Sequence, residues 1–265
     1  MITENNLRLD NKTILVTGAS GYIGSSVSRS ISMLGADLIL VDIDKEKLFK
    51  LSNDIKNQNP ANIKTINADL SKPKDVSKIF KYITSNKLSI NGLVNSIGIV
   101  GTSRKKGWNT TFLKQDQESW EKALEINLTS IFFFIQKMEK YMNNATDPSI
   151  VNISSMYGTY APDYSIYGGT KINNPAAYSV SKAGLTYLSK WLATSLAPKI
   201  RINSISPGGI YRNQEKKFVN KYIDKTLLKR MATEDDIAGC VVFLLSSLSS
   251  YITGQDIVID GGWGI

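Results

Sequence analysis

The chain has 265 residues, of which 42% are hydrophobic and 21% charged, with a formal net charge of +9 and no histidine. This length and apolar content predict a single soluble domain over residues 1–265. The lone cysteine, Cys240, excludes a disulfide framework. Without histidine we expect no metal site, and any acid–base chemistry must use tyrosine, lysine or carboxylates.

The distribution of residues disfavours membrane and nucleic-acid partners. The polar start, residues 1–12, lacks the apolar core of a signal peptide, so we expect a cytoplasmic protein. The longest aromatic-aliphatic run, at 131–135, is too short to cross a bilayer. The lysines are spread over segments such as 44–56 and 72–83, spaced like solvated helix faces, and no nucleic-acid motif accompanies them.

Short β-branched runs alternate with longer amphipathic stretches along the chain. This alternation predicts an α/β fold, a doubly wound parallel seven-stranded sheet with helices on both faces. Two long polar segments, 99–116 and 156–175, follow strands at the edge where such sheets place ligands. Strands are predicted at 13–17, 37–41, 63–67, 92–96, 149–153, 201–205 and 256–260, and helices at 22–34, 44–57, 73–85, 117–142, 176–197 and 234–247.

The first strand, turn and helix carry the glycine pattern "TGASGYIG" at residues 17–24. Gly18, Gly21 and Gly24 allow a tight turn, close approach of the backbone to a pyrophosphate, and tight helix–strand packing. The helix N-terminus then offers free N–H groups to phosphates. Asp42 ends the second strand, where a carboxylate accepts from ribose hydroxyls and repels a 2′-phosphate. We therefore expect a dinucleotide site that prefers NAD over NADP.

With these motifs the sequence resembles the short-chain dehydrogenase/reductase family over nearly its whole length. The resemblance implies a Rossmann fold of the short, single-domain branch and an NAD(P)-dependent oxidoreductase. The stretch "SMYG…NP…Y" also resembles members linked to flagellin or surface-polysaccharide modification. The elements that carry the resemblance are "ADL" (68–70), "LVNSIG" (93–98), "EINL" (125–128), "IVNISS" (150–155), "YSVSKAG" (178–184), "RINSISPGGI" (201–210) and "YITGQDIVIDGG" (251–262).

The resemblance implies roles for the residues at matching positions. Tyr178 exchanges a proton with the substrate oxygen, to which Ser155 donates a hydrogen bond. Lys182 lowers the pKa of the phenol and binds the nicotinamide ribose, and Asn127 holds a water that links the lysine to solvent. The implied cofactor-binding residues are Gly18, Ser20, Gly21, Tyr22, Ile23, Gly24, Asp42, Asp69, Leu70, Asn95, Ile97, Gly98, Tyr178, Lys182, Pro207, Gly208 and Ile210.

Three features depart from the family pattern. The glycine spacing is the form usual in the longer, sugar-nucleotide-epimerase branch, although length and C-terminal motif match the shorter branch. Arg212 replaces a threonine usually found near the nicotinamide amide. The interval between Ser155 and Tyr178 is longer than the family's usual one.

The pattern Tyr-x-x-x-Lys occurs twice, at Tyr167–Lys171 and at Tyr178–Lys182. The number of residues between Ser155 and the tyrosine favours the first pair. However, Gly168, Gly169 and Pro175 follow Tyr167 and disfavour a helix there. Pro175 suits instead the first turn of a helix that carries the second pair on one face. We therefore expect Tyr178–Lys182 to be the catalytic pair. Tyr167 then belongs to an insertion, residues 156–175, that is either a lid for a hydroxyl-rich substrate or a surface loop or subunit contact.

Three functions remain open at this point. The first is an oxidoreductase that interconverts an alcohol and a ketone on a polar, sugar-derived substrate. The second is a 3-oxoacyl carrier-protein reductase, which the basic charge favours and the polar insertion disfavours. The third is a non-catalytic dinucleotide sensor or scaffold, which would not need the Ser-Tyr-Lys-Asn set. The apolar segments 130–142 and 178–193 predict a homodimer or homotetramer.

Overall fold

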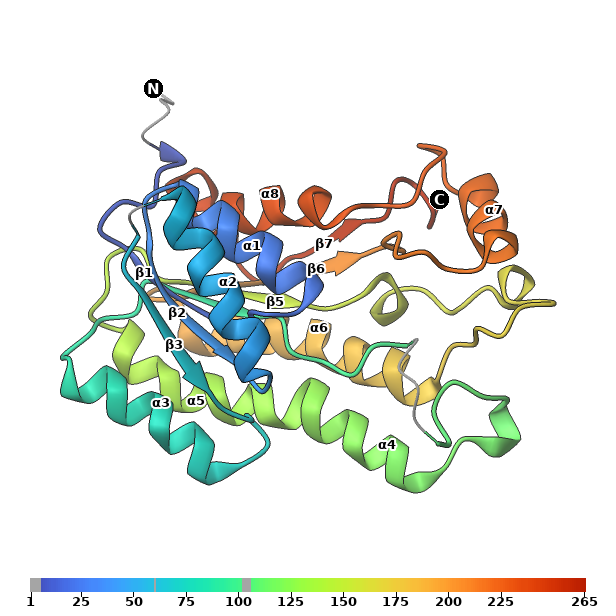
Figure 1. Ribbon diagram of the computed structural model, residues 1–265, viewed down its shortest axis with the longest axis horizontal. Coiled ribbons are helices and arrows are strands. Elements are labelled where there is room, and N and C mark those ends of the chain that lie inside the picture. The colour runs from blue at the N-terminus through green and yellow to red at the C-terminus, as the bar shows by residue number, and fades with distance from the viewer. Residues whose placement is uncertain (1–5, 60, 102–105) are drawn as a thin grey trace.

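The computed structural model describes residues 6–59, 61–101 and 106–265, and places one sheet between two layers of helices (Figure 1). Within these residues all seven strands are parallel, in the order β3-β2-β1-β4-β5-β6-β7. The predicted doubly wound fold is confirmed. The strands are β1 (Thr13–Thr17), β2 (Asp37–Asp42), β3 (Ile63–Asn67), β4 (Gly92–Asn95), β5 (Ser149–Ile153), β6 (Arg201–Pro207) and β7 (Asp256–Ile259).

Helices cover both faces of the sheet because its strands are apolar on both sides. Ile14 and Val16 of β1 pack into one core and Leu15 into the other, since successive strand side chains point to opposite faces. None of the helices in the described ranges has the length and hydropathy to span a bilayer. One face carries α1 (Tyr22–Met33), α2 (Lys45–Gln58) and α8 (Glu234–Leu245), and the other carries α3 (Pro73–Ser85), α5 (Ser130–Met142) and α6 (Ala176–Leu196) (Figure 1).

Two helical features differ from the sequence expectation. The predicted helix at 117–142 is interrupted: α4 (Gln117–Leu124) is followed by a π-helical turn, Glu125–Thr129, before α5 begins. Such π turns are frequent at functional sites. The helix α7 (Lys216–Lys225) was not predicted, because only Phe218 and Tyr222 of its polar sequence are buried.

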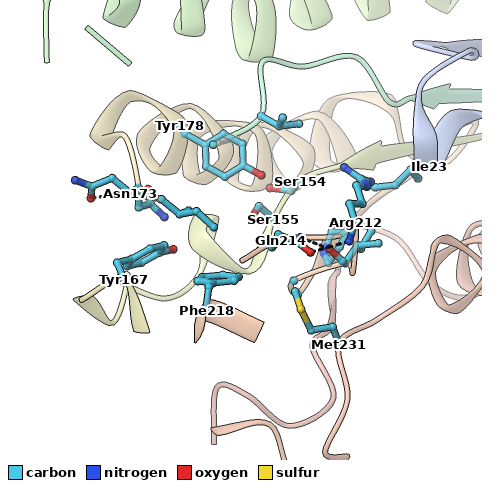
Figure 2. Close-up of a pocket in the computed structure, with 18 residues that line it drawn as sticks. Ile23, Ser154, Ser155, Tyr167, Asn173, Tyr178, Arg212, Gln214, Phe218 and Met231 are labelled. Atoms are coloured by element: carbon cyan, nitrogen blue, oxygen red, sulfur yellow. Dashed lines mark hydrogen bonds between the residues drawn. The ribbon is translucent and has the colours of Figure 1, made fainter. Parts of the chain in front are cut away.

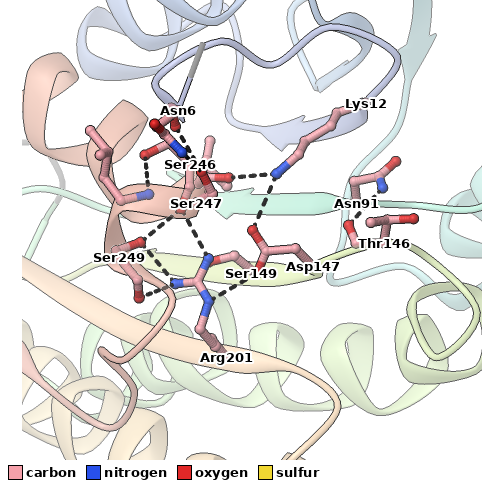
Figure 3. Close-up of polar contacts among 12 residues, drawn as sticks. Asn6, Lys12, Asn91, Thr146, Asp147, Ser149, Arg201, Ser246, Ser247 and Ser249 are labelled. Carbon is pink, nitrogen blue, oxygen red and sulfur yellow. Dashed lines mark hydrogen bonds and ion pairs between the residues drawn. The ribbon is translucent and has the colours of Figure 1, made fainter. Parts of the chain in front are cut away.

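A cationic network ties the sheet to the end of α8, at the amino ends of the strands (Figure 3). Arg201 is 8% exposed and its Nη1 donates to the carbonyl oxygens of Leu244 and Ser249, both at 3.1 Å. Its Nε lies 3.3 Å from a carboxylate oxygen of Asp147. These contacts satisfy carbonyls that the end of a helix leaves without intrahelical partners, and place a cation at the negative end of its dipole.

Candidate active site

An open cleft of about 880 Å³ lies at the carboxyl ends of β1, β2 and β4, where the strand order reverses. This is the position at which open α/β sheets bind ligands. We call it the glycine-turn cleft. Of the sequence-predicted cofactor residues, its walls contain Gly18, Gly21, Asp42, Asp69, Leu70, Ile97 and Gly98.

The glycine turn is shaped for close approach of a ligand to its backbone. Gly18 has φ +66°, and a Cβ there would lie 2.7 Å from the Ser96 carbonyl oxygen. A Cβ on Gly24 would overlap the carbonyl oxygen of Gly18. No described side chain caps the N-terminus of α1, and its first turn contains no acidic residue. Among the described residues, the N–H groups at this helix end are therefore without a capping side-chain acceptor or a negative charge in the same turn. This local chemistry fits the phosphates of a dinucleotide.

Asp42 is fixed at the edge of the cleft by two backbone donors. Its Oδ2 accepts from the N–H of Ser20 at 2.9 Å, and its Oδ1 accepts from the N–H of Asp44 at 3.0 Å. Each carboxylate oxygen has a further lone pair, so the group can still accept from ribose hydroxyls. Ser20 thus contacts Asp42 through its backbone N–H and is not among the residues that line the cleft.

Asn95, predicted to bind cofactor, lies away from the cleft in the interior of the sheet. It is fully buried, its amide donates to Oδ1 of Asn152 at 2.8 Å, and its own oxygen accepts from the Thr17 hydroxyl at 3.2 Å. These bonds link β1, β4 and β5. The neighbouring backbone, at Ser96 and Ile97, is what reaches the cleft.

A second hollow, about 800 Å³, adjoins the first through the chain at 97–101: Gly98 and Ile99 line the cleft, whereas Val100 and Gly101 line this hollow. We call it the tyrosine cavity. Of the predicted residues it contains Ile23, Ser155, Tyr178, Pro207, Gly208 and Ile210. The wall also contains Tyr167, Asn173 and Asn174 of the insertion and Arg212, at the usual threonine position. Its remaining polar or aromatic residues, to which the sequence had given no role, are Ser154, Gln214 and Phe218.

Tyr178 enters the cavity from the first turn of α6, with Ser155 near its hydroxyl (Figure 2). Burial raises the pKa of the Tyr178 phenol, while the hydrogen bond with Ser155 and the charge of Arg212 act in the lowering direction. Ser155 is 5% exposed and ends the strand-to-turn connection after β5. The pair can therefore address one ligand oxygen from two sides, one as proton donor and the other as hydrogen-bond donor.

Lys182 lies one helical turn beyond Tyr178, but its ammonium is directed at the end of β5. Its Nζ donates to the Ile153 carbonyl oxygen at 2.8 Å, and burial lowers the pKa of Lys182 to about 8. That Lys182 lowers the pKa of Tyr178 stays a prediction of the resemblance. Desolvation of the phenol outweighs the lowering contributions, and the cation among them is Arg212.

Asn127 lies in the π turn and holds the chain at the junction of the two hollows. Its Oδ1 accepts from the N–H of Ile99 at 2.7 Å, and its Nδ2 donates to the Ile99 carbonyl at 3.2 Å and to the Ser181 hydroxyl at 3.0 Å. A Cβ on Gly98 would lie 3.2 Å from Asn127 Oδ1 and 3.4 Å from Lys182 Nζ. The glycine therefore leaves room for both side chains beside the cleft.

The other Tyr-x-x-x-Lys pair does not form a helical unit. Tyr167 follows a short 3₁₀ turn, Tyr164–Ile166, and its ring packs 5.7 Å from that of Phe218. Lys171 is exposed, and its backbone N–H donates to Glu215. Tyr167 is thus part of the wall of the tyrosine cavity, and no hydrogen bond joins it to Lys171 among the described residues.

The insertion, residues 156–175, packs against α7 in a separate apolar cluster that the sequence did not predict. The spacing of Phe218 and Tyr222, one turn apart, is the signal by which α7 could have been found. Of the other long polar segment, 99–116, residues 102–105 lie outside the described part of the chain. The buried members of the cluster are Met156, Ile166, Tyr167, Phe218, Tyr222, Met231 and Trp263.

Comparison with known proteins agrees with this geometry. A protein family described as enoyl-(acyl carrier protein) reductase matches residues 18–264. Post-translational flagellin modification protein A of Campylobacter coli is 32% identical, over 97% of this chain and 100% of that protein. A 3-oxoacyl-acyl-carrier-protein reductase of Thermotoga maritima is 30% identical, over 97% of this chain and 99% of that protein.

A solved structure shows the same architecture. The short-chain dehydrogenase of Leptospira borgpetersenii with bound NAD+ superimposes with a TM-score of 0.84, is 32% identical, and covers 100% of this chain and 97% of its own. The resemblance drawn from the sequence motifs is confirmed. The chain is an oxidoreductase that belongs to the short-chain dehydrogenase/reductase family.

Proposed function

We propose that this enzyme uses NAD to interconvert an alcohol and a ketone on a polar, sugar-derived substrate. The observation that supports this most is the tyrosine cavity, where Tyr178 and Ser155 meet a wall of amides and a phenol from the insertion. Asn173 and Tyr167 lie at the end of the cavity away from Arg212 (Figure 2), and Asn174 also belongs to its wall. Such groups match the hydroxyls of a carbohydrate better than an alkyl chain.

In this proposal Tyr178 gives its proton to a carbonyl oxygen, or removes one from an alcohol, while Ser155 donates a hydrogen bond to the same atom. Lys182 binds the nicotinamide ribose, and Asn127 fixes the chain at 97–99 and connects the lysine with solvent. The glycine turn would hold the pyrophosphate, with Asp42 on the adenosine ribose and Asp69 and Leu70 beside the adenine. The nicotinamide supplies or accepts the hydride when it is bound.

A second candidate is reduction of a 3-oxoacyl chain on a carrier protein. The Thermotoga relative with that name, and the net charge of +9, which suits an acidic carrier, both favour it. The polar lining contributed by the insertion disfavours it.

We also propose that the chain works as one domain and as a cytoplasmic homodimer or homotetramer. All strands of the described residues share one sheet, and the single cysteine suits a reducing compartment. The outer faces of α5 and α6 expose Phe133 (51%), Tyr187 (70%) and Trp191 (52%). Large exposed aromatic side chains on neighbouring helices are typical of an interface. Light scattering that finds only monomer would refute the oligomer.

The test is a substrate screen followed by NADH absorbance, with keto-sugars, sugar acids and polyols in one arm and an acetoacetyl thioester in the other. We expect turnover in the carbohydrate arm alone. Turnover of the thioester alone would favour the carrier-protein reductase. Tight NADH binding without hydride exchange in either arm would instead favour a dinucleotide sensor or scaffold.

A further inference from the structure

We propose that Arg212 binds the pyrophosphate of the dinucleotide, as a side-chain clamp that lies across from the glycine turn. This assignment deepens the proposed function and rests on it. It concerns a residue at which this chain departs from its family's usual threonine near the nicotinamide amide, and to which no sequence motif assigned a phosphate-binding role.

The position of the Arg212 side chain is fixed from two directions. Its Nε donates to Oε1 of Glu234, in the first turn of α8, at 3.0 Å. Its Cζ lies 4.3 Å from the centre of the Tyr22 ring, a cation–π contact with the first residue of α1. The guanidinium is therefore held over the N-terminus of α1, beside Ile23, as Figure 2 shows.

The fixed guanidinium keeps an unused pair of donors. Among the described residues, only Nε of the Arg212 side chain has a hydrogen-bond or ion-pair partner, so its two terminal amino groups are free. The side chain is about one-quarter exposed and lines the tyrosine cavity. Two parallel N–H donors on a planar cation match two oxygens of a phosphate, and do so better than a lysine would.

The charges around the guanidinium indicate an anionic ligand. Arg212 is the only charged side chain in the wall of the tyrosine cavity as the described residues define it. Glu234 neutralises one edge of the guanidinium but leaves the edge with the free donors unopposed. Arg212 contacts Tyr22, the first residue of α1, so a dinucleotide pyrophosphate bound at the backbone donors of that helix would have the guanidinium nearby.

The test measures binding alone, so that it needs no substrate. Wild type, Arg212→Gln and the control Arg29→Gln are titrated with NADH by fluorescence, and bound NADH is then displaced with ADP and with adenosine. Arg29 is matched in charge and lies on the same helix as Tyr22, in an exposed ion pair with Asp54 at 3.4 Å. ADP carries the two adjoining phosphates and adenosine carries none.

We expect Arg212→Gln to lower the affinity for NADH and for ADP by about tenfold to a hundredfold and to leave the affinity for adenosine unchanged. Arg29→Gln should bind all three ligands as wild type does. Should Arg212→Gln fail to fold, Arg212→Lys serves, because a point charge without the fork should give a smaller loss for the same two ligands. Unchanged affinity for NADH and ADP would overturn the assignment, and would point to a substrate anion as the partner of Arg212. If wild type binds no NADH, the proposed function fails together with the clamp.

Discussion

The hydroxyl groups of Tyr157 and Tyr167 lie 2.6 Å apart where the insertion meets the body of the enzyme. Burial raises the pKa of both phenols, so both remain neutral at physiological pH. The phenol of the first Tyr-x-x-x-Lys pattern is thus paired with a second tyrosine. Tyr167 keeps its proton within a hydrogen-bonded wall, and its ring packs on α7.

Tyr157→Phe should destabilise the enzyme without altering its chemistry. Removing one hydroxyl of this buried pair should lower the free energy of unfolding by about 1 kcal/mol, because the Tyr167 oxygen loses a partner. Urea denaturation measures the change. Tyr187→Phe, which alters an exposed ring on α6, is the control and should leave the unfolding curve in place.

Arg201→Met should be more damaging, although it lies far from the tyrosine cavity. The variant removes the guanidinium from the Leu244 and Ser249 carbonyls and leaves Asp147 with Lys12 alone, which should lower the free energy of unfolding by about 3 kcal/mol. Thermal denaturation is the measurement. Lys199→Met, at an exposed position just before β6, should have little effect, and equal stability of the two variants would refute the role given to the network.

Lys182→Met should stabilise the free enzyme in a pH-dependent way. Burial lowers the pKa of Lys182 from 10.5 to about 8. Below pH 8 the lysine is charged in both states, but its charge is desolvated in the native state and hydrated in the unfolded state. At neutral pH the variant should be more stable by up to about 3 kcal/mol, less the lost bond to Ile153. From pH 8 to 10.5 Lys182 is neutral in the native state and still charged in the unfolded state. The free energy of unfolding of wild type should therefore rise relative to that of the variant as the pH increases.

Urea unfolding curves from neutral pH up to pH 10.5 measure this difference. The exposed Lys190→Met, on the same helix, is the control and should follow wild type throughout. A stability gap between wild type and Lys182→Met that stays constant across this range would show that the lysine has an ordinary pKa.

Asp42 should set the choice of dinucleotide. Its carboxylate is held at the edge of the cleft by two backbone donors, where it would repel a 2′-phosphate. We expect wild type to bind NADH at least about tenfold more tightly than NADPH, and Asp42→Asn to reduce that ratio. Fluorescence titration with both cofactors checks it, and equal or inverted affinities in wild type would refute the preference for NAD.

The sequence predicted the sheet and the glycine turn well because both depend on local signals. Apolar strands and amphipathic helices have distinct periods, and the glycine spacing lies within one strand–turn–helix unit. The π turn at Asn127 was missed, since nothing in "EINLT" distinguishes it from an α-helix. Asn95 was assigned to the cofactor by resemblance, whereas its amide is used within the sheet.

The tyrosine cavity could not be read from the sequence to the same extent. Its wall combines the insertion with α7 and the loop after β6, and their meeting depends on long-range packing of Tyr167 against Phe218. The pKa of the Tyr178 phenol also depends on charges that are close in space but distant in the sequence. Burial raises the pKa of Tyr178, and the cation that acts against this rise is Arg212, far along the chain, whereas Lys182, one turn away, hydrogen-bonds the end of β5.

The most direct measurement is turnover by Tyr178→Phe beside Tyr167→Phe, on whichever ketone of the substrate screen wild type reduces. Because Tyr178 would move the proton, its phenylalanine variant should lose about a hundredfold or more in turnover while still binding NADH. Tyr167→Phe, in the cavity wall, should keep at least about a tenth of wild-type turnover. Retention of turnover in Tyr178→Phe with its loss in Tyr167→Phe would contradict the assignment of the proton donor.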